Sequence, residues 1–224
     1  VWDGMGAVRD DGLTDLLGVA PGPANGFTLD LLESFARFGD RIDWAMIILN
    51  PLEPWPGSLV LDAAADHDVQ LLTRVVDYGG VFWDDVDSVD GMGERDHRRF
   101  RPEGWVQAGR ARLEAMRPIA ERHGLTMLQL AAAWNLAHPA VRCVAPTLMQ
   151  EAGEDAVPVE AKRAELAAVP AVSPLSAEEV EAIREAGDNT GSMELKGAAT
   201  GYDGPVVADR WPITEDLAAL GARY

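Results

Sequence analysis

Arg74, in the stretch LLTRVVDYGG, is the residue whose type and position first suggest chemistry. It interrupts the apolar run 69–76, which predicts a buried strand. A guanidinium group is planar and permanently charged, so it can stack on an aromatic ring or bind a phosphate. The sequence leaves two interpretations of Arg74. It contacts a ligand, or it is a surface residue paired with Asp77 or Asp85.

Other chemistry-bearing residues give weaker signals. His97 could act as an acid or base because histidine titrates near neutral pH, but its setting, ERDHRR, is typical of a solvated run of charges. The runs DDVD (84–87) and DHD (66–68) hold carboxylates without a partnered histidine on a fixed element, so we expect no metal site there. The sequence shows no Ser-His-Asp or Cys-His set for nucleophilic catalysis.

Composition limits the kinds of partner. The 224 residues carry a formal net charge of −18, which argues against nucleic acid and anionic membranes, because both require a basic surface. The single cysteine, Cys143, rules out an internal disulfide and favours a reducing compartment, so we expect a cytoplasmic protein. The sequence contains no apolar run of about 18 residues that could span a membrane, and no signal-peptide pattern at its start.

Strands and helices are predicted to alternate along the chain. Short apolar runs predict four strands, and the opening residues 1–15 look like the end of a helix that runs into the first of them. The predicted strands cover 14–20, 42–49, 69–76 and 141–146. The predicted helices cover 27–39, 58–66, 104–124 with a kink at Pro118, 126–139, 159–169 and 176–187. Residues 77–102 form a long irregular segment.

This alternation predicts an α/β fold with parallel strands. The first strand is not followed by Gly-x-Gly-x-x-Gly, and the chain has no Walker A loop, so neither a Rossmann site nor a P-loop is expected. A TIM (β/α)8 barrel fits better, but four strands make only half of one and would leave two bare edges. We expect a single partial barrel domain over 1–224, with strand–helix units in 1–187 and a tail in 188–224. The tail is expected to fold over the barrel mouth and to hold one short helix after Thr214.

Several motifs carry a resemblance to a known family. LTDLLGVA resembles the fifth strand of the aldo-keto reductases, NPLEP the turn after the sixth, and LLTRVVDYGG the seventh strand and its loop. The run LEAMRPIAERHGLTMLQLAAAWNLAHPAVRCVAPT is similar to the seventh helical region and the eighth strand. The likeness covers about residues 13–187, and it is strongest to the bacterial branch that oxidises free sugars or pyridoxal-like alcohols.

The resemblance implies hydride transfer between a nicotinamide cofactor, NADP(H) or alternatively NAD(H), and a small carbonyl or alcohol substrate. The cofactor of such enzymes lies across the carboxyl ends of the barrel strands. The family's catalytic tyrosine, lysine, aspartate and histidine belong to the first four strands, and none of those positions exists in this chain. The chain therefore resembles the cofactor-binding half, in which Arg74 is expected to contact the nicotinamide or the pyrophosphate.

Other positions carry over from the family with departures. Met46 stands where a glutamine usually binds the nicotinamide amide, and Ala20 stands in a serine–asparagine turn for which nearby Asn25 could substitute. The expected cofactor-binding residues are Ala20, Asn25, Met46, Arg74, Val75, Thr147, Gln150, Lys162 and Arg163. The expected substrate-loop residues are Trp83, His97 and Arg99.

Lys162 and Arg163 could bind the 2′-phosphate of NADP, or they could simply be solvated on a helix surface. If they do not reach the phosphate, the acidic insert before them would favour NAD. The expected macromolecular partner is the missing N-terminal half of the barrel or another copy of the chain. The rival to an enzyme is a non-catalytic aldo-keto-reductase-like subunit that binds a nucleotide or a partner protein.

Overall fold

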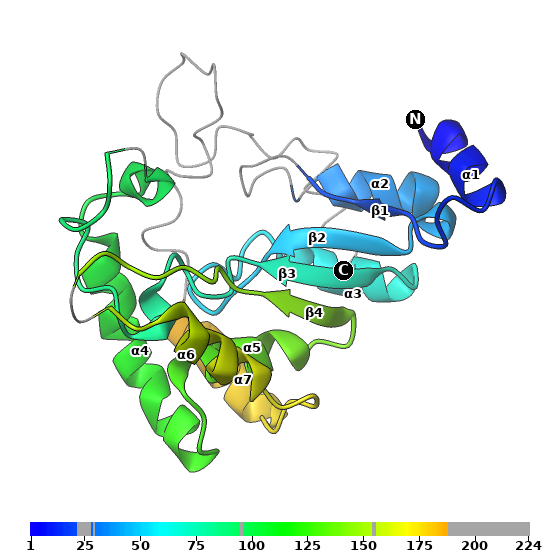
Figure 1. Cartoon of the computed structure of the whole chain (residues 1–224). Coiled ribbons are helices and arrows are strands. Elements are labelled where there is room, and N and C mark those ends of the chain that lie inside the picture. The colour runs from blue at the N-terminus through cyan, green and yellow to red at the C-terminus, as the bar shows by residue number, and fades with distance from the viewer. Residues whose placement is uncertain (22–27, 29, 95, 154–155, 188–224) are drawn as a thin grey trace.

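A four-stranded parallel sheet forms the centre of the computed structural model, which describes residues 1–21, 28, 30–94, 96–153 and 156–187 (Figure 1). The strands lie side by side in chain order, and every neighbouring pair is parallel. They are β1 Gly18–Val19, β2 Trp44–Ile48, β3 Gln70–Arg74 and β4 Val141–Ala145. Parallel neighbours need a crossover between them, and the helices supply it.

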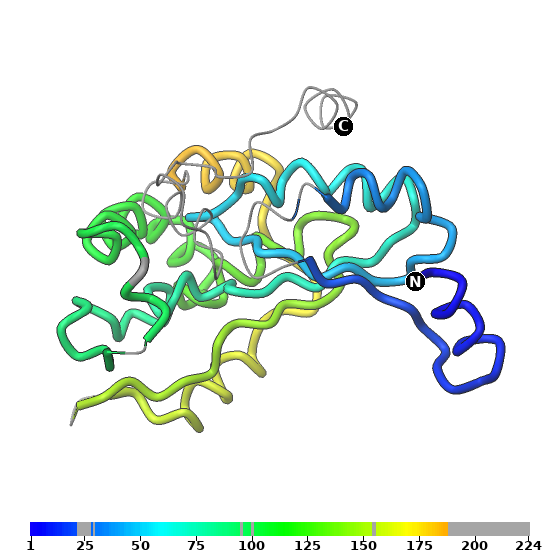
Figure 2. The backbone as a smooth tube through the Cα atoms, turned by 90° about the horizontal axis from the view of Figure 1, so that it is seen from above, coloured from blue at the N-terminus to red at the C-terminus, as the bar shows by residue number. Residues whose placement is uncertain are grey.

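The helices of the described residues follow the predicted order. The α-helices are α1 Trp2–Asp10, α2 Asp30–Phe38, α3 Ser58–Asp66, α4 Trp105–Arg122, α5 Met127–Leu136, α6 Val159–Ala167 and α7 Ala177–Gly187. Short 3-10 helices are η2 Gly39–Arg41, η3 Val81–Trp83 and η4 His97–Phe100. Helices α2 and α3 lie behind the sheet in Figure 1, and the view from above in Figure 2 shows both on the same side.

The two faces of the sheet differ in how well they are covered. Ala45 and Ile47 of β2 and Leu71 of β3 point toward the helices and are fully buried. Met46 and Leu72 point to the opposite face, as alternation along a strand requires, and are only half-buried. The register places Met46 beside Leu72, so the exposed face of the sheet is apolar at its centre.

Local sequence explains where the helices begin. Helix α5 starts with a capping box, in which the Thr126 hydroxyl accepts from the Gln129 backbone N–H and the Gln129 side chain accepts from the Thr126 N–H. Helix α2 buries Leu31, Leu32 and Phe35 along one side, which matches its apolar spacing. Helix α4 continues through Pro118, where a kink was predicted.

The predicted strands are confirmed in order and direction, although each is shorter than its apolar run. The first, predicted over 14–20, is reduced to β1, and the N–H of Leu17, the residue before it, donates to the Asp43 side chain at 2.7 Å. The predicted tail, 188–224, and its short helix lie outside the described residues. Among the residues that the structure describes, no helix is both long and apolar enough to cross a membrane.

Candidate functional site

The carboxyl ends of the four strands form one edge, here called the carboxyl rim: Ala20, Ile48, Arg74 and Ala145, with the segments that follow them. The register aligns Arg74 with Ile48 of β2 and with Ala145 of β4. Parallel α/β sheets bind their ligands at this end, because the crossover loops converge there. The rim is therefore the place to look for the predicted cofactor residues.

Arg74 is a half-buried cation at the centre of this rim. Burial lowers the pKa of its guanidinium, and the negative charge of Glu53 acts in the opposite direction. Among the described residues, none forms a hydrogen bond or an ion pair with the Arg74 side chain. No such contact therefore offsets the cost of its partial burial. A cation in this state is suited to an anion or an aromatic ring supplied by a ligand.

The alternative interpretation of Arg74, an ion pair with Asp77 or Asp85, is not found. Asp77 is buried and accepts the backbone N–H groups of Gly80, at 2.9 Å, and Thr147, at 2.7 Å. Asp85 pairs instead with Lys162. Burial raises the pKa of the Asp77 carboxyl, while its hydrogen bonds from the backbone lower it.

An apolar depression lies on the face of the sheet that the described residues leave open, the face to which Leu72, two residues before Arg74, points. It has a volume of about 270 Å³ and is lined by residues of the first three strands and by Ala20. Met46 and Leu72 line it together with Ala20, so two of the predicted cofactor residues, Met46 and Ala20, lie at the same place. The predicted residue Asn25 lies outside the described residues. The methionine thioether offers only a weak acceptor, so this surface can pack against a flat ring but cannot replace the amide hydrogen bonds of a glutamine.

The segment after β4 is tied to the segment after β3. The Trp83 indole N–H donates to the Thr147 carbonyl at 3.1 Å, and the Thr147 N–H is held by Asp77. Both backbone groups of Thr147 are therefore fixed, while its side chain is exposed at the rim. Gln150 is also exposed, so both predicted residues remain accessible to a ligand.

Lys162 is neither exposed on the helix surface nor free to bind a 2′-phosphate. Its side chain is 1% exposed, and its Nζ lies 2.6 Å from Asp85 Oδ2 and donates to the Met149 carbonyl at 2.8 Å. Its interpretation as a solvated surface residue is wrong, and a role at a 2′-phosphate would require it to leave these partners. Arg163, the next residue of α6, is exposed and has no ion pair with a described residue.

Two of the three predicted substrate-loop residues contact other parts of the chain. Trp83 is 7% exposed and packs under the ammonium group of Lys162, whose Nζ lies 5.3 Å from the ring centre. His97 is exposed, and Arg99 donates to the carbonyls of Val89 and Met92. Their contact with a substrate stays a prediction.

Sequence reasoning missed two buried arginines. Arg98 belongs to the run interpreted as solvated, yet its side chain is 3% exposed and pairs with Asp96 and Glu151, each at 2.7 Å. Arg101 pairs with Glu53 at 3.2 Å and stacks over Tyr78. The one local signal for Arg98 was Asp96, whose carboxylate accepts the Arg98 backbone N–H as a helix cap.

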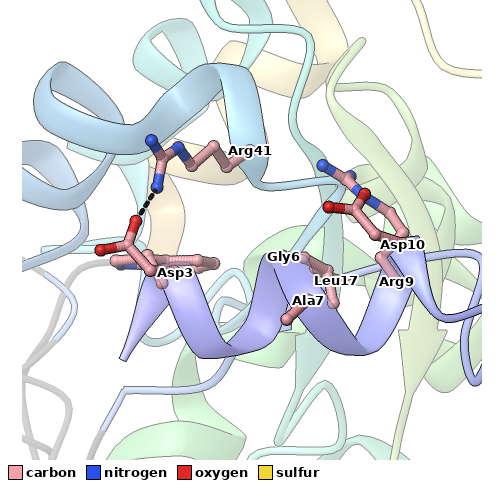
Figure 3. Close-up of a pocket in the computed structure, with 8 residues that line it drawn as sticks. Asp3, Gly6, Ala7, Arg9, Asp10, Leu17 and Arg41 are labelled. Atoms are coloured by element: carbon pink, nitrogen blue, oxygen red, sulfur yellow. Dashed lines mark hydrogen bonds and ion pairs between the residues drawn. The ribbon is translucent and has the colours of Figure 1, made fainter.

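A second pocket lies at the opposite end of the sheet (Figure 3). It measures about 340 Å³ and is bounded by α1, by Leu17 before β1 and by Arg41 before β2. Two ion pairs lie at this pocket, Asp3 with Arg41 at 2.9 Å and Arg9 with Asp43 at 3.5 Å. Residues at the amino ends of barrel strands generally serve stability, so the carboxyl rim is the better candidate site.

Four successive parallel strand–helix units define part of an α/β barrel of the TIM type. The model of the aldo/keto reductase family matches residues 1–188, and the chain belongs to that family. The fold class expected from the sequence is thereby confirmed.

Solved structures agree with this assignment. The aldo-keto reductase AKR11C1 from Bacillus halodurans in its apo form superposes with a TM-score of 0.56 at 17% identity, covering 85% of this chain and 57% of that one. Its holo form gives 0.54 at 18% identity, covering 85% and 56%. The thermostable aldo-keto reductase Tm1743, in complex with the inhibitor epalrestat, gives 0.51 at 21% identity, covering 83% and 53%. At these identities the likeness concerns the fold alone.

The chain spans little more than half the length of these structures. Comparison with curated protein sequences gives no match.

Proposed function

We propose that this chain supplies the cofactor-binding part of an NAD(P)-dependent oxidoreductase. The reaction is hydride transfer between the nicotinamide ring and a small carbonyl or alcohol, with sugars, aldehydes and pyridoxal-like alcohols as the candidate substrates. Membership of the aldo/keto reductase family supports the reaction class. The chain's own contribution is to bind and orient the cofactor.

Arg74 is the observation that carries this proposal. It is a half-buried guanidinium at the carboxyl rim, without a hydrogen-bond or ion-pair partner among the described residues, on the face of β3 where Leu72 lines an apolar depression. A dinucleotide combines a doubly charged pyrophosphate with flat rings, and this pair of features suits both. Thr147 and Gln150 lie exposed on the neighbouring segment, where they can donate to phosphate or ribose oxygens.

The choice between NADP and NAD depends on α6. Lys162 is held by Asp85 and by the Met149 carbonyl, which leaves Arg163 as the accessible cation for a 2′-phosphate on this helix. We propose NADP as the cofactor, with Arg163 as its discriminating residue and NAD as the alternative. If Arg163 has this role, Arg163→Ala should weaken NADP⁺ binding and leave NAD⁺ binding unchanged.

Calorimetric titration of the full chain with NADP⁺ and NAD⁺ tests the proposal. Arg74→Ala should weaken dinucleotide binding by about tenfold, the worth of one charge-assisted contact. Arg74→Lys keeps the charge but loses the planar fork, so it should recover only part of the affinity. Arg142→Ala is the matched control, because this exposed arginine lies near the amino end of β4, away from the carboxyl rim.

Two results would count against the proposal. Failure of the wild-type chain to bind either dinucleotide would remove the cofactor assignment. Equal affinities for wild type and Arg74→Ala would remove the rim site. Binding without turnover by the chain alone is expected under both functions, because the family's catalytic residues belong to strands that this chain does not contain. Binding without turnover by a complete barrel would favour the rival function, a non-catalytic nucleotide-binding subunit.

A further inference from the structure

The residue that follows Arg74 has an unfavourable backbone conformation. Val75 has a φ angle of +59°, in the left-handed region that β-branched side chains rarely adopt. Such a conformation persists only where the surroundings hold it, and it is often found next to functional residues. Since Val75 is directly bonded to Arg74, whatever holds Val75 also fixes the turn that carries the rim cation.

Asn50, in the segment that follows β2, contacts this turn. Its side chain is fully buried, and its Nδ2 donates to the Val75 carbonyl at 2.8 Å. The same Nδ2 donates to Glu53 Oε2 at 3.0 Å, and Oδ1 accepts the Leu52 N–H at 2.9 Å. Both amide protons and the carbonyl oxygen of Asn50 are thus used, which fixes the orientation of its side chain.

Glu53 in turn is held by a buried arginine. Arg101 Nη2 lies 3.2 Å from Glu53 Oε2, and the two side chains are 3% and 2% exposed. The Arg101 guanidinium lies over the Tyr78 ring at 4.3 Å and over the Trp105 ring at 5.0 Å. A continuous chain of buried contacts, here called the relay, therefore connects Trp105 at the start of α4 with Val75, through Arg101, Glu53 and Asn50.

We propose that Asn50 and Glu53 are positioning residues for the dinucleotide site, because they lock the turn at Val75 and so present the Arg74 guanidinium to the ligand. This inference rests on the proposed function of the rim. A cation whose backbone is already fixed loses less conformational entropy when a ligand binds, and the affinity for the ligand is higher for that reason. Asn50 and Glu53 lie inside the protein and act through Arg74.

A merely structural role for Asn50 is the competing explanation, and Asn135 provides a matched control. Asn135 is also fully buried, and its Nδ2 also donates to a backbone carbonyl, that of Ala131, at 2.8 Å. It belongs to α5, outside the relay. Asn50→Ala removes three hydrogen bonds and Asn135→Ala removes one, so Asn50→Ala should lose more stability. Only Asn50→Ala should lose affinity.

The test is a double-mutant cycle on the full chain, with NADP⁺ as the probe and calorimetry for the dissociation constant. Asn50→Ala should weaken binding by about tenfold, and Asn135→Ala by less than about twofold. Glycine adopts a positive φ without strain, so in a Val75→Gly background the same Asn50→Ala change should weaken binding by only about threefold. Asn50→Ser is a milder variant, with an intermediate loss expected, should Asn50→Ala fail to fold.

Different outcomes overturn different claims. If the wild-type chain binds NADP⁺ but Asn50→Ala behaves like Asn135→Ala, the positioning role is wrong and the rim site stands. An unchanged tenfold loss in the Val75→Gly background would also refute it, because Asn50 would then act independently of the strained turn. If the wild-type chain binds neither NADP⁺ nor NAD⁺, the proposed function fails and this inference with it.

Discussion

Replacement of Lys162 by methionine should destabilise the fold far more than a change at any exposed residue of α6. The variant keeps most of the apolar stem but removes the ammonium group that lies 2.6 Å from Asp85 and 2.8 Å from the Met149 carbonyl. The two side chains of the pair are 1% and 6% exposed. Asp85 would therefore remain buried without its counter-charge.

Removing one partner of a buried ion pair typically costs about 3–5 kcal/mol of unfolding free energy. The lower end applies here, since Asp85 can take up a proton and so escape part of the penalty. We expect a loss of about 3 kcal/mol near neutral pH for Lys162→Met, measured by urea unfolding. Arg163→Met is the control, because this adjacent side chain is exposed and should change stability by less than about 0.5 kcal/mol.

The loss should also depend on pH in a defined direction. Burial raises the pKa of the Asp85 carboxyl in the native protein, with the hydrogen bond and charge of Lys162 opposing it. Without Lys162 the pKa rises further. A carboxyl with a raised folded-state pKa destabilises the fold at high pH, and the penalty is relieved as the pH falls through that pKa. The deficit of Lys162→Met should therefore shrink as the pH falls below neutral.

A double-mutant cycle with Asp85→Asn gives the refuting result. If the pair is coupled as the geometry indicates, Lys162→Met/Asp85→Asn should be more stable than the sum of the single losses by about 1–3 kcal/mol. Additive losses, within about 0.5 kcal/mol, would show that the buried pair is not formed in solution.

Three further predictions concern the elements around the site. Gly80→Ala should lose about 1–3 kcal/mol of unfolding free energy, because Gly80 has a φ of +102° and a Cβ would lie 2.6 Å from Val86 Cγ2. Gly93→Ala is the control, because Gly93 has open space around it; equal losses for the two variants would contradict the prediction. Thr126→Ala removes the capping box of α5 and should cost about 1 kcal/mol by the same assay, whereas Thr14→Ala in an exposed turn should not; an unchanged midpoint for Thr126→Ala would speak against the cap. The backbone N–H of Ser176, with Arg122 and His123, lowers the pKa of Glu179 to about 2. The stability that Glu179 contributes is therefore present above the ordinary pKa of 4.5 and is lost as the pH falls toward 2. Glu179→Gln should make the unfolding free energy depend less on pH in that window, and an unchanged pH dependence would count against the prediction.

The fold was predictable because its signals are local. An apolar run such as 42–49 predicts a strand of a parallel sheet from its own residues. The Thr126–Gln129 pair likewise predicts a helix start without reference to the rest of the chain. The position of Arg74 at a strand end followed from the same local pattern.

The site was less predictable because its contacts join distant segments. The three arginines in and beside ERDHRR that the structure describes differ little in local sequence, and only the arrival of Glu151 from the segment after β4 makes Arg98 a buried residue. Lys162 and Asp85 likewise meet through the approach of α6 to the loop after β3. The role of Asn50 depends on the backbone angle of Val75, which no feature of a valine predicts.

The most direct test of the central claim is to map where the dinucleotide binds. Backbone amide chemical shifts of the full chain should be recorded with and without NADP⁺. We predict that the largest changes occur at the carboxyl rim, at Arg74, Val75 and Thr147. Changes centred instead on Arg9, Leu17 and Arg41, at the amino ends of the strands, would contradict the account.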